Sequence, residues 1–160
     1  MKIPIAYAVN RMFKASSFLY SLMFSIVLLS CTSNLTQMEI PTNAGSELQE
    51  LHGAEKYVED TALFYPGIAD ASMRPVLSAK INLAIDDFLQ IVRSGNATEQ
   101  AYLDAIRKGL FRFNKIDLDT EDRERTAGYF MQMMDIVGLE SSDGLLNRFV
   151  YDWDPSEDEN

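Results

Sequence analysis

The residue with the clearest chemistry in this sequence is Cys31, the single cysteine among 160 residues. Its thiol follows an apolar run, Ala15–Leu29, that is interrupted only by serines. The preceding segment, Met1–Lys14, carries three basic residues and no acidic residue. A basic start followed by an apolar run is the layout of an export signal. The position of Cys31 just behind such a signal predicts that its thiol is an attachment point for lipid.

The segment Leu28-Leu29-Ser30-Cys31 resembles the lipobox of bacterial lipoproteins, with an aliphatic residue three positions before the cysteine and a small residue directly before it. The resemblance implies cleavage before Cys31, a diacylglycerol on its thiol and a third acyl chain on the new amino terminus. Two or three acyl chains hold a protein firmly on a bilayer, whereas one chain binds only marginally. Thr32 stands where inner-membrane lipoproteins carry Asp, so the resemblance favours the periplasmic face of the outer membrane.

Two alternatives to a lipoprotein remain open, an uncleaved transmembrane anchor and a secreted protein cut at another small residue. A spanning helix needs about 20 apolar residues. The apolar run before Cys31 is about 15 residues long. This length favours the lipoprotein.

The charge of the chain limits its partners. The formal net charge is −10, and loss of the signal segment with Lys2, Arg11 and Lys14 lowers it to −13 on the remaining 130 residues. A field of that sign repels phosphate backbones, so we expect no nucleic-acid partner and favour a cationic protein, a basic peptide or a metal ion. With its only thiol acylated the mature chain has no disulfide, and its length fits one domain stabilised by packing.

The other residue types offer little for catalysis. His52 is the only histidine, so a nucleophilic triad would depend on it alone, and a surface or packing role is the commoner one. One His and one Cys also exclude a zinc site of the usual type. Glu124 and Asp135 could form a carboxylate pair, but eleven helical residues would separate them by about 16 Å, more than glycosidases need. The sequence therefore predicts no catalytic residue and no cofactor.

A run of acids at 117–122 offers oxygen ligands that a hard cation such as calcium accepts. The central glycine and the distal glutamate of an EF-hand loop are both missing from this run. Acids at a helix start are also favoured by the helix dipole. We therefore interpret the run as a solvent-facing helix start and predict no metal site.

The connection after Gly138 is the candidate binding site. It places small polar groups between apolar residues, a composition found both in capping turns and in ligand-contacting loops. Trp153 is a second candidate, either packed on the domain or exposed for recognition. The candidate binding residues are Glu140, Ser141, Ser142, Asp143, Asn147 and Trp153.

Apolar spacing of three and four residues predicts an all-α, single-domain bundle of four to five helices. The expected helices run from Ser46 to about Leu63, from about Pro75 to Ser94, from about Asn96 to Asn114, from Asp119 to Gly138 and from Ser142 to Phe149. We divide the chain into a signal peptide (1–30), a flexible tether (31–45), the helical domain (46–155) and an acidic tail (156–160).

Four motifs in the domain resemble those of a bacterial family of small domains of unknown function. They are Tyr65-Pro66-Gly67, the Gly-Leu-x-x-Phe segment 109–113, the Thr-Glu-Asp-Arg-Glu run 120–124 and the stretch 134–147 that contains Gly-Leu-Glu-Ser-Ser-Asp-Gly-x-Leu-Asn. The resemblance covers roughly 63–155 and implies a family, but no activity and no catalytic residue.

The leading hypothesis is a membrane-anchored lipoprotein with a non-enzymatic, protein-binding helical domain. Its sharpest version is an immunity-like protein that blocks a cationic toxin, because an acidic surface steers association with a basic cleft. The alternatives are an envelope enzyme that uses a carboxylate site near 140–147 and a purely structural envelope lipoprotein.

Overall fold

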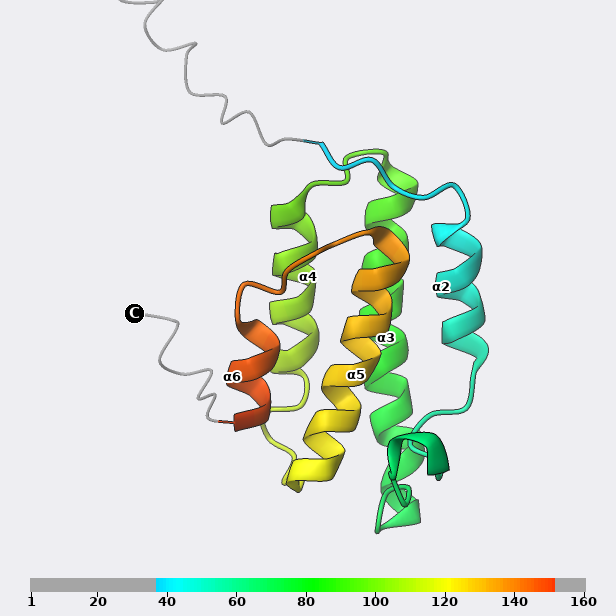
Figure 1. Ribbon diagram of the computed structural model, residues 1–160, viewed down its shortest axis with the longest axis vertical. Coiled ribbons are helices and arrows are strands. Elements are labelled where there is room, and N and C mark those ends of the chain that lie inside the picture. The colour runs from blue at the N-terminus through cyan, green and yellow to red at the C-terminus, as the bar shows by residue number, and fades with distance from the viewer. Residues whose placement is uncertain (1–36, 152–160) are drawn as a thin grey trace, which may run out of the picture. The chain divides into compact units, whose positions relative to one another are not determined.

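The computed structural model describes residues 37–151, in which helices surround one long central helix, α3 (Figure 1). α3 contacts α2, α4 and α5, while α6 packs against α5 and α4. The helices are α2 (Ala44–Gly53), α3 (Arg74–Ser94), α4 (Glu99–Phe111), α5 (Thr120–Val137) and α6 (Leu145–Tyr151), with short 3-10 turns η1 (Thr61–Leu63) and η2 (Ala71–Met73). Residues 37–151 contain two isolated β-bridges and no strand. The predicted all-α fold is confirmed.

Helices α3 and α5 begin and end close to the predicted positions. Pro75 lies in the first turn of α3, where its missing N–H costs no hydrogen bond. Asp119 caps α5 by accepting a hydrogen bond from the Asp122 N–H at 2.8 Å. Gly95 and Gly138 end the two helices in the left-handed conformation that glycine adopts without a steric penalty. Local signals were sufficient here because each cap lies within three residues of the helix it ends.

The first helix differs from the prediction at both ends. It begins at Ala44, so residues 44 and 45 are helical instead of part of a tether. The segment before it is also attached, because the Met38 N–H donates to the Ala97 carbonyl at 2.8 Å. The helix ends at Gly53, ten residues before the predicted end. There the buried ammonium of Lys56 donates to the carbonyls of residues 51, 52 and 54 at 2.8–3.1 Å and satisfies the helix end.

Two further helix starts are displaced. Thr98, and not Asn96, caps α4 by accepting a hydrogen bond from the Ala101 N–H. α6 begins at Leu145 instead of Ser142, because Asp143 and Gly144 both have positive φ angles and cannot continue a right-handed helix.

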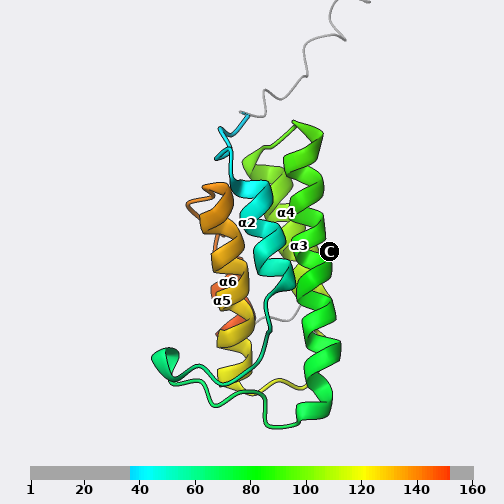
Figure 2. The ribbon, with the colours of Figure 1, turned by 90° about the vertical axis from the view of Figure 1, so that its right-hand side faces the viewer.

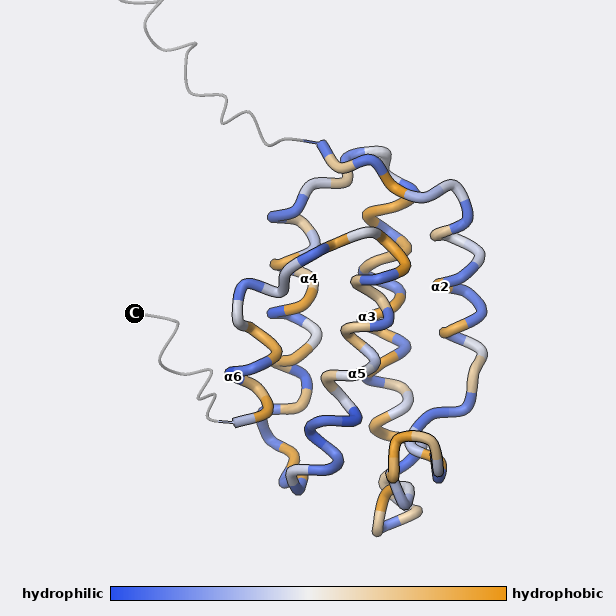
Figure 3. The backbone as a smooth tube through the Cα atoms, viewed as in Figure 1, coloured by the Kyte–Doolittle hydropathy of each residue, from blue (hydrophilic) through white to orange (hydrophobic). Residues whose placement is uncertain are grey.

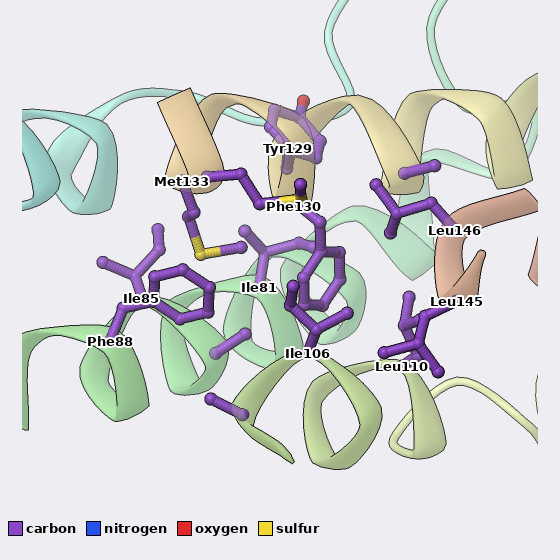
Figure 4. Packing of buried hydrophobic residues seen from close by; sticks show 14 of the residues in the cluster. Ile81, Ile85, Phe88, Ile106, Leu110, Tyr129, Phe130, Met133, Leu145 and Leu146 are labelled. Carbon is purple, nitrogen blue, oxygen red and sulfur yellow. The ribbon is translucent and has the colours of Figure 1, made fainter. Parts of the chain in front are cut away.

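The core lies between α3, α4, α5 and α6. Figure 4 shows Phe130 of α5 pointing between Ile81 of α3 and Ile106 of α4, with Leu110 and Leu145 close by. All five side chains are buried. Figure 3 shows apolar and hydrophilic residues alternating along the helices, and a further apolar stretch in the connection between α2 and α3. Tyr57 and Tyr65 of this connection belong to the core, whereas Leu63 and Phe64 stay exposed and lead to the candidate site. No helix within the described residues is long and apolar enough to cross a membrane.

Residues 37–38 and the connection between α2 and α3 lie at opposite ends of the bundle. Residues 37–38 lie beside the C-terminal end of α3, where Met38 bonds to Ala97. The 54–73 connection lies at the opposite end, before the start of α3 (Figures 1 and 2). α3 has 21 residues, so the two ends are about 30 Å apart at 1.5 Å per residue.

One ion pair on the outside of the bundle joins α3 to α4. Asp87 accepts hydrogen bonds from Lys108 at 2.8 Å and from Arg112 at 2.6 Å. Burial by itself raises the pKa of the Asp87 carboxyl, but the hydrogen bonds and charges of the two cations outweigh burial and hold the pKa below its ordinary value of 3.8. The ionised carboxylate therefore stabilises the fold above that pH.

We expect Asp87→Asn to lower the free energy of unfolding at pH 7 by about 1 kcal/mol, because a charge-assisted pair that is partly exposed is lost. Since the folded-state pKa lies below the unfolded one, the stabilisation is lost as the pH falls below 3.8 through the folded pKa. Urea unfolding of both proteins between pH 2 and pH 7 tests this. A difference that stays constant down to pH 2 would contradict it.

Candidate functional site

The connection between α2 and α3 forms a tight turn that projects from the bundle. Asp60 and Tyr65 exchange two backbone hydrogen bonds, of 2.8 and 3.0 Å. The Asp60 carboxylate also accepts hydrogen bonds from the N–H groups of Ala62 and Leu63 inside the turn. At its tip Leu63 is 64 % exposed and Phe64 is 93 % exposed. We call residues 60–65 the projecting turn.

Phe64 sits in an unfavourable backbone conformation. Its φ of 54° and ψ of 26° are left-handed, a region that bulky L-residues rarely adopt. Such strain costs on the order of 1–3 kcal/mol and often marks functional sites. The turn thus places a large aromatic side chain in solvent, and no packing of that side chain compensates for the cost of the backbone conformation.

Arg125 of α5 fixes the projecting turn to the bundle. Its Nη1 donates to Asp60 Oδ2 at 3.1 Å, and its Nε donates to the Tyr129 hydroxyl at 3.2 Å. The guanidinium also lies over the rings of Tyr65 and Tyr129, 5.3 and 5.0 Å from their centroids. Arg125 therefore contacts both ends of the projecting turn, Asp60 and Tyr65, as well as Tyr129 of its own helix. The ion pair of Arg125 with Asp60 joins residues 65 positions apart in the chain.

Beneath Arg125 lies a buried hydrogen-bond network. The Tyr65 hydroxyl donates to Asp122 Oδ1 at 2.5 Å, and the Tyr57 N–H donates to the Tyr129 hydroxyl at 2.7 Å. The hydroxyl of Tyr57 lies 2.8 Å from that of Thr126. Burial raises the pKa values of Tyr57 and Tyr65 above their ordinary value, so both stay neutral hydroxyl groups. Burial also raises the pKa of Asp122, although the hydrogen bond from Tyr65 lowers it.

A comparison of two buried tyrosines tests how much this network contributes to the free energy of unfolding. The Tyr102 hydroxyl is buried and has no hydrogen-bond partner among residues 37–151, and burial raises its pKa to about 12. We expect Tyr102→Phe to leave the free energy of unfolding unchanged or raise it by up to about 1 kcal/mol. Tyr57→Phe should lower it by about 1 kcal/mol, since the buried hydrogen bond to the Thr126 hydroxyl is lost and that hydroxyl keeps only its bond to the Asp122 carbonyl. Equal losses in the two variants, measured by urea unfolding, would argue against the network as drawn.

The projecting turn and α5 enclose a groove with a volume of about 420 Å³. Its apolar wall is Leu63 and Phe64, its acidic wall is Glu121 and Glu124, and the floor includes Gly128. We call it the α5 groove. Its remaining lining residues are Tyr65, Arg125 and Gln132.

A second pocket, of about 290 Å³, lies nearby and is lined by four carboxylates. These belong to Asp70, Asp117, Asp119 and Asp122, and we call it the acidic pocket. Within residues 37–151 no three His, Cys, Asp or Glu side chains converge in a way that could hold a metal ion. Asp122 has a carboxylate oxygen bound to Tyr65, so it joins this pocket to the buried network.

The candidate residues predicted from the sequence lie elsewhere. Glu140, Ser141, Ser142 and Asp143 form the connection from α5 to α6, and Asn147 is exposed on α6. The Ser141 hydroxyl accepts a hydrogen bond from the Asp143 N–H at 3.0 Å, a bond inside the connection that caps neither α5 nor α6. None of these side chains lines the α5 groove or the acidic pocket. Cys31 and Trp153 lie outside the described residues.

His52 takes a surface position. Its Nε2 lies 3.7 Å from Asp86 Oδ1, and both side chains are about half exposed. Sequence reasoning missed Tyr57 and Asp60 because residues 54–63 were assigned to a helix, and it missed Arg125 because its partner Asp60 lies 65 residues away in the chain. The sequence signal for this connection was Tyr65-Pro66-Gly67. Gly67 has a φ of 85°, and a Cβ at this position would lie 3.1 Å from the Glu59 nitrogen, so the turn requires glycine here.

Comparison with known proteins supplies a family. The family described as "Domain of unknown function (DUF4844)" matches residues 39–154. A crystal structure of a DUF3571 family protein from Acinetobacter baumannii AYE is similar, with 31% sequence identity and a TM-score of 0.63. The match covers 68% of this chain and 88% of that chain. Among curated proteins none matches. The expected relation to small domains of unknown function is confirmed, and the chain belongs to the DUF4844 family.

Proposed function

We propose that this protein is a lipid-anchored bacterial lipoprotein whose helical domain binds a protein partner without catalysing a reaction. The observation that carries the binding role is the projecting turn, which holds Phe64 almost fully in solvent at the cost of a left-handed backbone. Aromatic residues, phenylalanine among them, are enriched at protein interfaces relative to the rest of the surface. The framework of Asp60, Tyr65 and Arg125 supplies the rigidity.

The anchor is Cys31, on the lipobox-like segment that precedes it. Cys31 lies six positions before Gln37, so the chain between them is at most about 21 Å long. The proposed anchor therefore joins the domain at the bundle end that carries residues 37–38, and the projecting turn lies at the other end of the bundle (Figures 1 and 2). The periplasmic face of the outer membrane is the proposed location. An immunity-like role fits the acidic character of the chain, because a basic target would be steered to it.

Crosslinking in the native envelope tests both parts of the proposal. The tagged, full-length protein is captured after mild crosslinking and read by mass spectrometry beside Cys31→Ala and Phe64→Asn variants. We expect one stoichiometric protein partner with the wild type and none with Phe64→Asn. Asn tolerates the left-handed conformation, so this variant should keep the fold. Labelling with a palmitate analogue should mark the wild type and not Cys31→Ala.

The possible results of this experiment are distinct. Capture that is unchanged in Phe64→Asn would overturn the role of the projecting turn. Capture of no specific protein would leave a structural envelope lipoprotein as the better description. Label on Cys31→Ala would overturn the lipid anchor.

An envelope enzyme is the second candidate function. It is favoured by Asp122, whose pKa is raised by burial and whose carboxylate lines the acidic pocket. Perturbed carboxylates in pockets are a common feature of acid–base catalysis. If this function were the right one, Asp122→Asn would abolish turnover of an envelope substrate while partner capture through Phe64 continued.

A further inference from the structure

We propose that the α5 groove binds a basic segment of the partner protein, which inserts an apolar side chain against Leu63 and Phe64 and places Lys or Arg residues against Glu121 and Glu124. This inference rests on the proposed binding function and adds the surface and the chemistry of the partner. Three observations carry it: the charge of the groove and its neighbouring pocket, a glycine that the fold does not require, and the strained exposure of Phe64.

The charge around the groove is strongly one-sided. The side chains lining the α5 groove and the acidic pocket include six carboxylates and one guanidinium. That guanidinium, Arg125, is already paired with Asp60 at 3.1 Å. Glu121 and Glu124 are exposed. Among residues 37–151 the structure records no ion-pair partner for either glutamate. A cationic segment could therefore pair with both without displacing another residue.

Gly128 is the second observation. It lies in the interior of α5, where glycine costs about 0.5–1 kcal/mol relative to alanine. A Cβ built on Gly128 would meet nothing within 4 Å, so packing gives no reason for glycine. The residue does line the α5 groove, where any side chain would narrow the space. The missing Cβ lets a binding segment approach the helix backbone closely.

The walls of the groove set the form of the bound segment. The apolar wall, Leu63 and Phe64, is presented on a turn held by Arg125 and cannot collapse onto α5. From Glu121 to Gln132 the groove follows eleven residues of α5, about 16 Å at 1.5 Å per residue. This length suits a short helix or extended segment with one apolar anchor between basic residues.

Other occupants fit less well. A second copy of this chain would bring the same carboxylates to the groove, and like charges repel across an interface. The C-terminal tail 156–160 is acidic and meets the same objection. The complementary partner is therefore a basic segment of another protein.

Binding of two matched peptides tests the proposal. The full-length, lipidated protein in detergent micelles is titrated with two dye-labelled peptides of equal length and identical Leu and Trp positions. One peptide carries Lys at all flanking positions and the other carries Glu. We expect the Lys peptide to bind at least about tenfold more tightly, by fluorescence anisotropy, and the difference to shrink as salt is raised.

Variants locate the binding. Glu121→Gln with Glu124→Gln should weaken Lys-peptide binding about tenfold, and so should Gly128→Leu, which fills the groove. The matched control is Glu39→Gln with Glu50→Gln, which removes the same charge from exposed positions outside both pockets and should change binding less than about twofold. Circular dichroism of each variant confirms the fold.

The outcomes separate this inference from the proposed function. No saturable binding of the Lys peptide, equal binding of both peptides, or equal loss in the two double variants would overturn the basic-segment inference. If envelope capture still depended on Phe64 in that case, the protein-binding function would stand with a different partner chemistry. Self-association abolished by Gly128→Leu would instead identify a second copy as the occupant and overturn the inference.

Discussion

Replacing Arg125 by methionine should lower the free energy of unfolding by about 3 kcal/mol, the largest effect that we expect from a single substitution outside the core. Arg125 is only 12 % exposed in its side chain, and its loss leaves Asp60 with an unpaired carboxylate 30 % exposed. The contacts over Tyr65 and Tyr129 and the hydrogen bond to the Tyr129 hydroxyl disappear with it. Methionine keeps much of the volume of the arginine side chain, so the lost free energy of unfolding reflects charge and hydrogen bonding more than packing.

Urea unfolding followed by circular dichroism measures the loss, and hydrogen exchange of residues 57–68 measures the release of the projecting turn. Arg107→Met is the matched control, because Arg107 pairs with Asp104 on an exposed helix face. That variant should change stability by less than about 0.5 kcal/mol. If both variants lost the same free energy, or if exchange of the turn did not change, Arg125 would not be the residue that holds the turn.

Gly109→Ala should lower the free energy of unfolding by about 2 kcal/mol, although alanine favours helices. A Cβ on Gly109 would lie 2.6 Å from Cε1 and 2.7 Å from Cζ of Phe130, and 3.2 Å from Cβ of Ala84. The Phe130 ring is buried between helices, as Figure 4 shows, and cannot move aside freely. The clash therefore outweighs the gain of about 1 kcal/mol in helix propensity.

Gly128→Ala is the control, since it makes the same chemical change in a neighbouring helix with open space at the Cβ. It should raise the free energy of unfolding by about 0.5–1 kcal/mol. The loss from Gly109→Ala should also shrink in a Phe130→Leu background, because leucine lacks the two ring atoms that the Cβ would meet. Additive losses in that double variant would show that the ring is not the obstacle.

The helices α3 and α5 could be predicted because their determinants are local. Apolar residues at steps of three and four, Pro75 at one start and Asp119 at the other, and a glycine at each end all lie within the helix or beside it. The prediction was wrong at residues 54–63 because the end of α2 depends on Lys56. That side chain folds back onto three carbonyls, which no periodicity reports.

The candidate site could not be predicted from spacing along the chain. Its central contacts join Tyr57 to Tyr129, Asp60 to Arg125 and Tyr65 to Asp122, each 57 to 72 residues apart. The sequence did contain motifs at both ends of the contact between Tyr65 and Asp122, at 65–67 and 120–124, but as separate segments. Only packing of the α2–α3 connection on α5 makes them one surface.

The sequence by itself determined the fold class and the acidic charge of this protein, because helix periodicity and net charge depend on residue types and short spacings alone. The lipid attachment at Cys31 is likewise a prediction from a local motif. The tertiary structure decided where an apolar tip, two glutamates and a glycine meet, and that the candidate residues at 140–147 lie outside that surface. These features depend on contacts between residues that are distant in the chain. Such contacts form only when the helices pack, so no local sequence pattern reports them.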